Sequence, residues 1–177
     1  MTTLNLRLLL VFSLLTQLIY GCSKEEQAPP EGSDLANEIA VLVLEKTNAI
    51  RRDQGLPPLS ASKAADAMAQ YHSDNMVTHQ FFSHTDHEGT SPSDRADQMG
   101  VTWSAIAENI ANIPWHENVS GCGDTRTAEA LAECMVEGWR NSPGHYRNMI
   151  GDFAELGVGI TFSKDSIVFG TQIFRTP

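Results

Sequence analysis

The sequence is poor in basic residues: 12 lysines and arginines stand against 22 aspartates and glutamates, which gives a formal net charge of −10 at pH 7. This acidic balance argues against binding to a nucleic-acid backbone, which requires a positively charged surface. It also argues against direct adhesion of the folded domain to anionic lipid. We therefore expect no nucleic-acid partner, whereas binding of a cation is compatible with the charge.

Long apolar runs are scarce, and the run at residues 8–20 is shorter than the about 20 residues that a membrane-spanning helix needs. We interpret this run as the core of a signal peptide. It ends in Leu18-Ile19-Tyr20-Gly21-Cys22, which is similar to a bacterial lipobox, so Cys22 is predicted to become a lipidated N-terminus. The alternative is an ordinary secretory signal in which Cys22 is incidental.

Three parts are predicted along the chain: a signal peptide at 1–21, a flexible tether at 22–33 that joins lipidated Cys22 to the domain, and a folded domain at 34–177. The tether has no large apolar side chain to pack, and its Pro-Pro pair stiffens it. Ser23 stands where an aspartate would indicate retention at the inner membrane. We therefore expect export and lipid anchoring in the cell envelope, at the outer membrane in a Gram-negative cell.

Cysteine is also rare, with three in the chain. Lipidation of Cys22 would leave Cys122 and Cys134, whose spacing matches no common zinc module. In an oxidising compartment this pair is expected to form a disulfide that pins the loop before a helix to that helix. Two free thiols are the alternative.

Apolar periodicity predicts a domain of the α+β class. Helices are expected at 35–53, from Ser60 to about Thr78, from Ser91 to Gly100, from Asp124 to about Arg140 and from Ser142 onward. Strands are expected at 156–162 and 167–174, with Ser163–Ser166 as a hairpin connection, and a strand or extended segment is expected at 105–111. Gly157 and Gly159 leave one face of their strand open to close packing.

Two histidines stand out within these predicted helices. The second helix would bury Ala65, Met68, Ala69, His72 and Met76, so His72 is interpreted as a hydrogen-bonded core histidine. The run Trp139 to Met149 places His145 in the first turn of a helix that begins at Ser142-Pro143, a hydroxyl cap followed by proline. A structural histidine at a helix corner is the alternative for His145.

The Trp-x-x-Ser-Pro-Gly-His-x-x-Asn pattern of that run resembles the signature of the CAP superfamily, which comprises cysteine-rich secretory proteins, antigen 5 and pathogenesis-related 1 proteins. Further fragments follow in the family's order: Ala49 to Leu59, Tyr71 to Met76, Phe81 to His84, Gly89 to Arg95, Ala107 to Ile110, Glu155 to Gly159 and Phe169 to Phe174. The resemblance covers about residues 35–175. It implies a three-layer α–β–α sandwich with a small antiparallel sheet.

The resemblance also implies a cleft lined by His84, Glu108, Trp139 and His145. Ala107 departs mildly from the family's Gly-Glu-Asn motif, and Ser142 stands where a second glutamate is usual. The two histidines would bind zinc or another divalent cation weakly, because two protein ligands leave the remaining positions to water. Glu108 is the candidate catalytic residue, as a general base beside such a metal.

Binding is favoured over catalysis because the chain holds no Gly-x-Ser-x-Gly elbow and no His-Glu-x-x-His motif. The leading hypothesis is an envelope-anchored binding module for a lipid, small ligand or peptide. The alternative is a metal-assisted hydrolase, either a peptidase or a cell-wall enzyme, and a purely structural lipoprotein is a third hypothesis. The remaining histidines, His79, His87 and His116, are expected to be solvated loop residues.

Overall fold

The computed structural model describes residues 33–177, so the predicted signal peptide, the lipobox with Cys22 and the tether up to residue 32 lie outside the described part of the chain. The described elements are α1 (Ser33–Asp53), β1 (Ser60–Ala61), α2 (Lys63–His79), α3 (Pro92–Gln98), β2 (Ala105–Pro114), α4 (Ala128–Arg140), α5 (Pro143–Met149), β3 (Glu155–Phe162) and β4 (Ile167–Thr176). None of the helices within this range combines the length and the apolarity needed to cross a bilayer.

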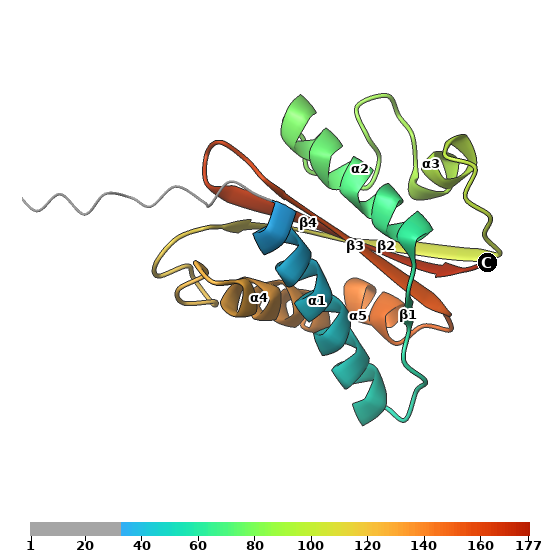
Figure 1. Ribbon diagram of the computed structural model, residues 1–177, viewed down its shortest axis with the longest axis horizontal. Coiled ribbons are helices and arrows are strands. Elements are labelled where there is room, and N and C mark those ends of the chain that lie inside the picture. The colour runs from blue at the N-terminus through green and yellow to red at the C-terminus, as the bar shows by residue number, and fades with distance from the viewer. Residues whose placement is uncertain (1–32) are drawn as a thin grey trace, which may run out of the picture.

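The elements form three layers around one sheet, with strand order β1-β3-β4-β2. Helices α1, α4 and α5 cover one face, and α2 and α3 cover the other (Figure 1). Strand β4 pairs antiparallel with both β2 and β3, whereas the short β1 runs parallel to β3. The predicted α+β class and the α–β–α sandwich are confirmed.

The larger core lies between α1, α4 and the sheet. It contains the fully buried side chains of Ile39, Val43, Leu131 and Phe174. Trp139 belongs to this core as well: it is 2% exposed, and its indole Nε1 donates to the carbonyl of Ile110 at 2.9 Å. Our expectation that Trp139 lines an open cleft is therefore wrong, because the indole supports β2 from inside the fold.

On the opposite face, α2 lies backbone to backbone on β3. The predicted buried stripe of α2 is confirmed. A Cβ added at Gly157 would lie 2.0 Å from the carbonyl carbon of Ala65, and one at Gly159 would lie 2.2 Å from the backbone nitrogen of Gln70. The absence of two side chains thus fixes how deeply α2 settles on the sheet.

The outer edge of β3 is only partly covered by a strand, since β1 pairs with two of its residues. Beyond these two residues, side chains of α2 bind the backbone of β3 in place of a strand. The carboxylate of Asp66 accepts from the Val158 amide at 3.0 Å, and the Gln70 side chain accepts from the Ile160 amide at 3.1 Å and donates to the Ile160 carbonyl at 3.2 Å. Helix α2 therefore satisfies backbone groups that a further strand would otherwise bind.

Three predicted helix starts differ from the structure. Ser62 caps α2, because Ser60 is held in β1 opposite Glu155. Thr127 caps α4, whereas Asp124, the predicted start of this helix, binds the guanidinium of Arg126. Ser142 precedes α5 as predicted, but its hydroxyl makes no capping hydrogen bond, and Pro143 alone marks the start of that helix.

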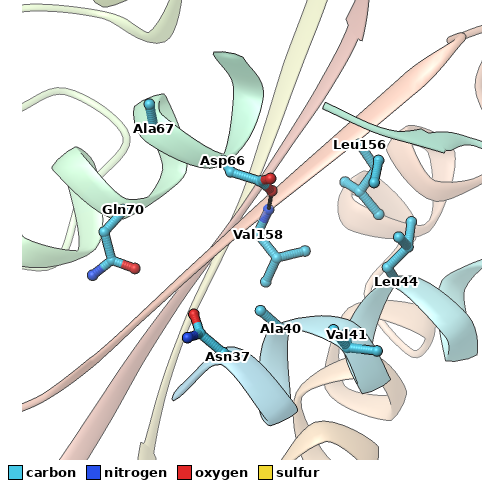
Figure 2. Close-up of a pocket in the computed structure, with 10 residues that line it drawn as sticks. Asn37, Ala40, Val41, Leu44, Asp66, Ala67, Gln70, Leu156 and Val158 are labelled. Atoms are coloured by element: carbon cyan, nitrogen blue, oxygen red, sulfur yellow. Dashed lines mark hydrogen bonds between the residues drawn. The ribbon is translucent and has the colours of Figure 1, made fainter. Parts of the chain in front are cut away.

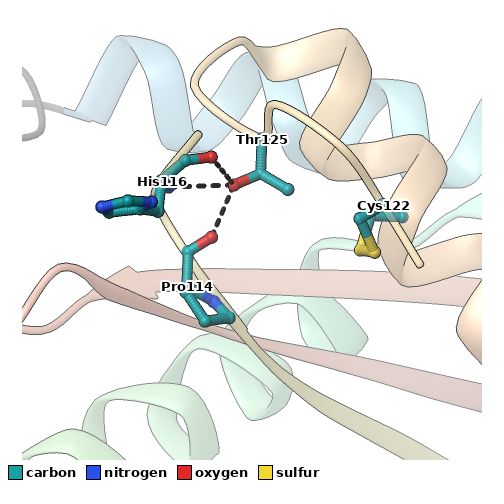
Figure 3. The surroundings of a disulfide bond; sticks show 5 residues. Pro114, His116, Cys122 and Thr125 are labelled. Atoms are coloured by element: carbon teal, nitrogen blue, oxygen red, sulfur yellow. Dashed lines mark hydrogen bonds between the residues drawn. A yellow bond between two sulfur atoms is a disulfide. The ribbon is translucent and has the colours of Figure 1, made fainter. Parts of the chain in front are cut away.

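The predicted disulfide between Cys122 and Cys134 is confirmed, with 5.3 Å between the two Cα atoms. It ties the loop after β2 to α4 (Figure 3). The same loop is held by Thr125, whose hydroxyl donates to the Pro114 carbonyl and accepts from the His116 amide. Closing so short a loop stabilises the fold by about 2–3 kcal/mol, chiefly by restricting the unfolded chain.

Candidate functional site

The candidate site is centred on Glu108, which points from β2 into the layer formed by α2, α3 and the loop between them. Its carboxylate is almost fully buried, with 1% of the side chain exposed. Oε1 lies 2.8 Å from Nδ1 of His84, and Oε2 accepts from Nη2 of Arg95. The structure therefore brings together two residues that the sequence predicted and one that it did not.

Arg95 is the residue that sequence reasoning missed. It lies in α3 with 1% of its surface exposed. Besides the ion pair with Glu108, its Nη1 donates to the carbonyl of His84 at 2.9 Å and to that of Thr90 at 3.0 Å. Arg95 thus neutralises the buried carboxylate and also fixes the loop that presents His84. A buried charge is stable only when it is paired and hydrogen-bonded in this manner.

His72 lies behind the same carboxylate. It is fully buried, its Nε2 donates to the Ser83 carbonyl at 2.9 Å, and that nitrogen is 3.6 Å from Oε1 of Glu108. Burial lowers the pKa of His72, and this effect outweighs the opposing influence of the Glu108 carboxylate. The interpretation of His72 as a hydrogen-bonded core histidine is therefore confirmed, although its contact with the site was not foreseen.

His145 reaches the site from the first turn of α5. Its ring centroid lies 6.3 Å from that of His84, with the rings tilted by 59°. Burial, and to a smaller degree the neighbouring His84, lower the pKa of His145. At neutral pH this imidazole is therefore uncharged and able to accept a hydrogen bond or bind a metal.

An amide network holds α5 against β2. Asn148 donates to the Glu108 carbonyl at 3.2 Å and to the Asn109 side-chain oxygen at 2.9 Å. Asn109 in turn donates to the carbonyl of His145 at 3.2 Å. The asparagine of the Trp-x-x-Ser-Pro-Gly-His-x-x-Asn run thus fixes the distance between His145 and the strand that carries Glu108.

The donor set is limited for a metal ion. Within residues 33–177 no group of three or more histidine, cysteine, aspartate or glutamate residues has the arrangement of a metal site. Because Nδ1 of His84 is taken by Glu108, Nε2 of that ring is the nitrogen left for a ligand, and a carboxylate behind a metal-binding imidazole is a usual arrangement. The residues present fit an ion held by two imidazoles and completed by water or ligand atoms.

Two surface grooves lie away from this cluster. One, of about 540 Å³, is lined by the end of α2, Phe81, Phe82 and the β3–β4 hairpin. The other, of about 490 Å³, lies between α1 and α2 above the edge of β3 (Figure 2). Neither groove contains the predicted cleft residues among its lining residues.

Two features place this chain in a class of proteins. One is the α–β–α sandwich, and the other is the imidazole–carboxylate cluster of His84, Glu108 and His145, which come from a loop, a strand and a short helix. Residues 44–174 match the cysteine-rich secretory protein family, CAP, and the chain belongs to that family.

Bacterial proteins are among those to which the chain is similar. The chain is 30% identical to the uncharacterized protein YkwD of Bacillus subtilis over 118 residues. This matched region is 66% of this chain and 40% of YkwD. An extracellular protein of Bacillus anthracis with an SCP domain superposes with a TM-score of 0.65 at 27% identity, over 85% of this chain and 45% of the other. An outer surface protein of Borrelia burgdorferi, at 18% identity, superposes with a TM-score of 0.65 over 81% of this chain and 95% of its own, and shares the fold.

Proposed function

We propose that this CAP domain is exported, tethered to the cell envelope through a lipid on Cys22, and binds a lipid, small ligand or peptide at the His84–Glu108–His145 site, with a weakly held divalent ion as part of that site. The lipobox-like sequence supports the tether. The extracellular character of the Bacillus anthracis neighbour supports export. The chain spans less than half of the length of that protein and of YkwD. We therefore do not assign the activity or partners of those longer proteins to this chain.

We favour binding over catalysis because both carboxylate oxygens of Glu108 already have partners. One oxygen faces Arg95 and the other faces His84. A general base must take a proton from a water or substrate, and a carboxylate already committed to a buried guanidinium and an imidazole is poorly placed to do so. We therefore assign Glu108 the role of orienting His84, whose side chain remains 47% exposed toward a ligand.

The first prediction is that His84→Ala and His145→Ala each remove most zinc binding, since either change leaves one imidazole. Affinity should be lower at pH 5.5 than at pH 7.5, because protons compete with the metal for imidazole nitrogen. Titration calorimetry at pH 7.5 and 5.5 measures both effects. His116→Ala is the control, because His116 follows the far end of β2.

Equal zinc affinity in the parent and in both cleft variants would eliminate this ion site.

Hydrolysis is the second candidate function, favoured by the imidazole–carboxylate pair itself. Turnover of a peptide or cell-wall substrate that depends on zinc and is lost in Glu108→Gln, under conditions where that variant is folded, would replace the binding proposal with a hydrolase.

The second prediction concerns the tether. Cys22→Ser removes the thiol that would carry the lipid, so the variant should leave the membrane fraction or accumulate with its signal peptide attached. Cell fractionation and the mass of the mature N-terminus measure this. Cys122→Ser is the control, because it removes a disulfide cysteine of the folded domain instead. A Cys22→Ser protein that fractionates and migrates like the parent would refute the anchor.

A further inference from the structure

The groove between α1 and α2 contains a carboxylate that the proposed site does not use. Its walls are mostly apolar and include Ala40, Val41 and Leu44 from α1 and Leu156 and Val158 from β3. Asp66, from the first turn of α2, is the charged residue among its lining residues, and its carboxylate lies over the edge of β3 (Figure 2).

The surroundings of this carboxylate are unusual for a surface aspartate. One of its oxygens accepts from the Val158 amide, and within residues 33–177 the side chain has no lysine, arginine or histidine as an ion-pair partner. Gln70, the neighbouring polar side chain, is already engaged by the Ile160 backbone, Asp74 and Thr161. Asp66 therefore provides the groove with a negative charge that no neighbouring cation neutralises.

Partial burial of Asp66 makes this unneutralised negative charge more costly. Loss of contact with water raises the pKa of Asp66, and the hydrogen bond from Val158 counteracts the shift only in part. A ligand that displaces the remaining water must supply a positive charge, because a neutral ligand would leave the carboxylate without compensation and an anion would be repelled. The apolar walls favour a ligand whose cationic group carries an aliphatic chain.

We propose that this groove is a second ligand site, which takes a small aliphatic amine with its ammonium group on Asp66 and its hydrocarbon chain along Ala40, Val41 and Leu44. The size of the groove, about 490 Å³, suits a small molecule. A metal ion is a poorer occupant, since hard cations need several oxygen ligands and the groove offers one carboxylate.

The test is a titration of the full chain with hexylammonium, followed by the backbone amide NMR signals of Val158 and Leu44. We expect saturable shifts at millimolar concentration, tighter binding than for butylammonium, and no saturable shift with hexanoate or hexanol. Asp66→Asn keeps an oxygen that accepts from the Val158 amide, so it preserves the fold while removing the charge. It should weaken hexylammonium binding at least about tenfold, as expected when a charged hydrogen bond becomes a neutral one.

Glu88→Gln is the matched control, because it removes the same charge from an exposed position in the loop between α2 and α3. It should leave hexylammonium binding unchanged. Equal affinity in the parent and in Asp66→Asn would overturn the proposal, as would equal weakening by both substitutions or the absence of saturable shifts. Binding of a lysine-containing peptide without binding of free hexylammonium would overturn it as well, since the occupant would then be a protein segment.

Discussion

Gly157→Ala is expected to destabilise the fold by about 3 kcal/mol or more, at the upper end of the usual penalty for overpacking. The added Cβ would lie 2.0 Å from the carbonyl carbon of Ala65 and 2.2 Å from the backbone nitrogen of Asp66. These are backbone atoms of α2, so no rotamer change can relieve the clash. The helix would have to lift from the sheet, which would also disturb the Asp66–Val158 hydrogen bond. Urea unfolding followed by circular dichroism measures the loss.

Gly138→Ala is the matched control for this prediction. Gly138 lies inside α4, and a Cβ there would meet nothing within 4 Å. Because alanine is the better helix former, this variant should be more stable than the parent by about 0.5–1 kcal/mol. If Gly157→Ala unfolds at the same urea concentration as the parent, the close contact between α2 and β3 is not tight in solution.

The second large effect is expected from Glu108→Gln, which should destabilise the protein by about 3–5 kcal/mol. The substitution leaves the guanidinium of Arg95 buried without a counter-charge, and an amide cannot accept from both Arg95 and His84 as the carboxylate does. Glu137→Gln provides the comparison, since Glu137 pairs with Arg140 at the surface, where the two side chains are 38% and 53% exposed. That variant should lose no more than about 1 kcal/mol.

A double substitution separates the ion pair from simple packing. In Arg95→Met with Glu108→Gln, the uncompensated charge is gone, so the double variant should lose less than the sum of the two single variants by more than about 1 kcal/mol. Strict additivity of the three free energies of unfolding would show that Arg95 and Glu108 stabilise the fold independently.

Elements with a strong local pattern were predictable from the sequence. The periodicity of 35–53, the alternation of 156–162 and the two glycines of that strand led to the helix, the strand and the close packing that the structure shows. Helix starts were less predictable, because neighbouring hydroxyls compete: Ser60 and Ser62 are both good caps, and pairing of Ser60 with β3 decides between them.

The candidate site was predictable only where a family motif marks it. His84, Glu108 and His145 carry such motifs, and the structure places them together. Arg95 ends the family-like fragment Gly89 to Arg95, but it lies on a short polar helix, and no local pattern there distinguishes a buried arginine from a solvated one. The role of Arg95 depends on the long-range packing of α3 against β2. This packing cannot be predicted from a single sequence. Trp139 belongs to a motif too, but the motif does not indicate which side of the strand its indole packs against.

The covering of the β3 edge by Asp66 and Gln70 has a consequence for behaviour at high local concentration. An open strand edge is a template on which neighbouring copies can add strands and aggregate. Here the Val158 amide and both the amide and the carbonyl of Ile160 are already bound by side chains of the same molecule. A neighbouring copy would have to displace these contacts before it could pair, so α2 also keeps each molecule from extending the sheet of the next.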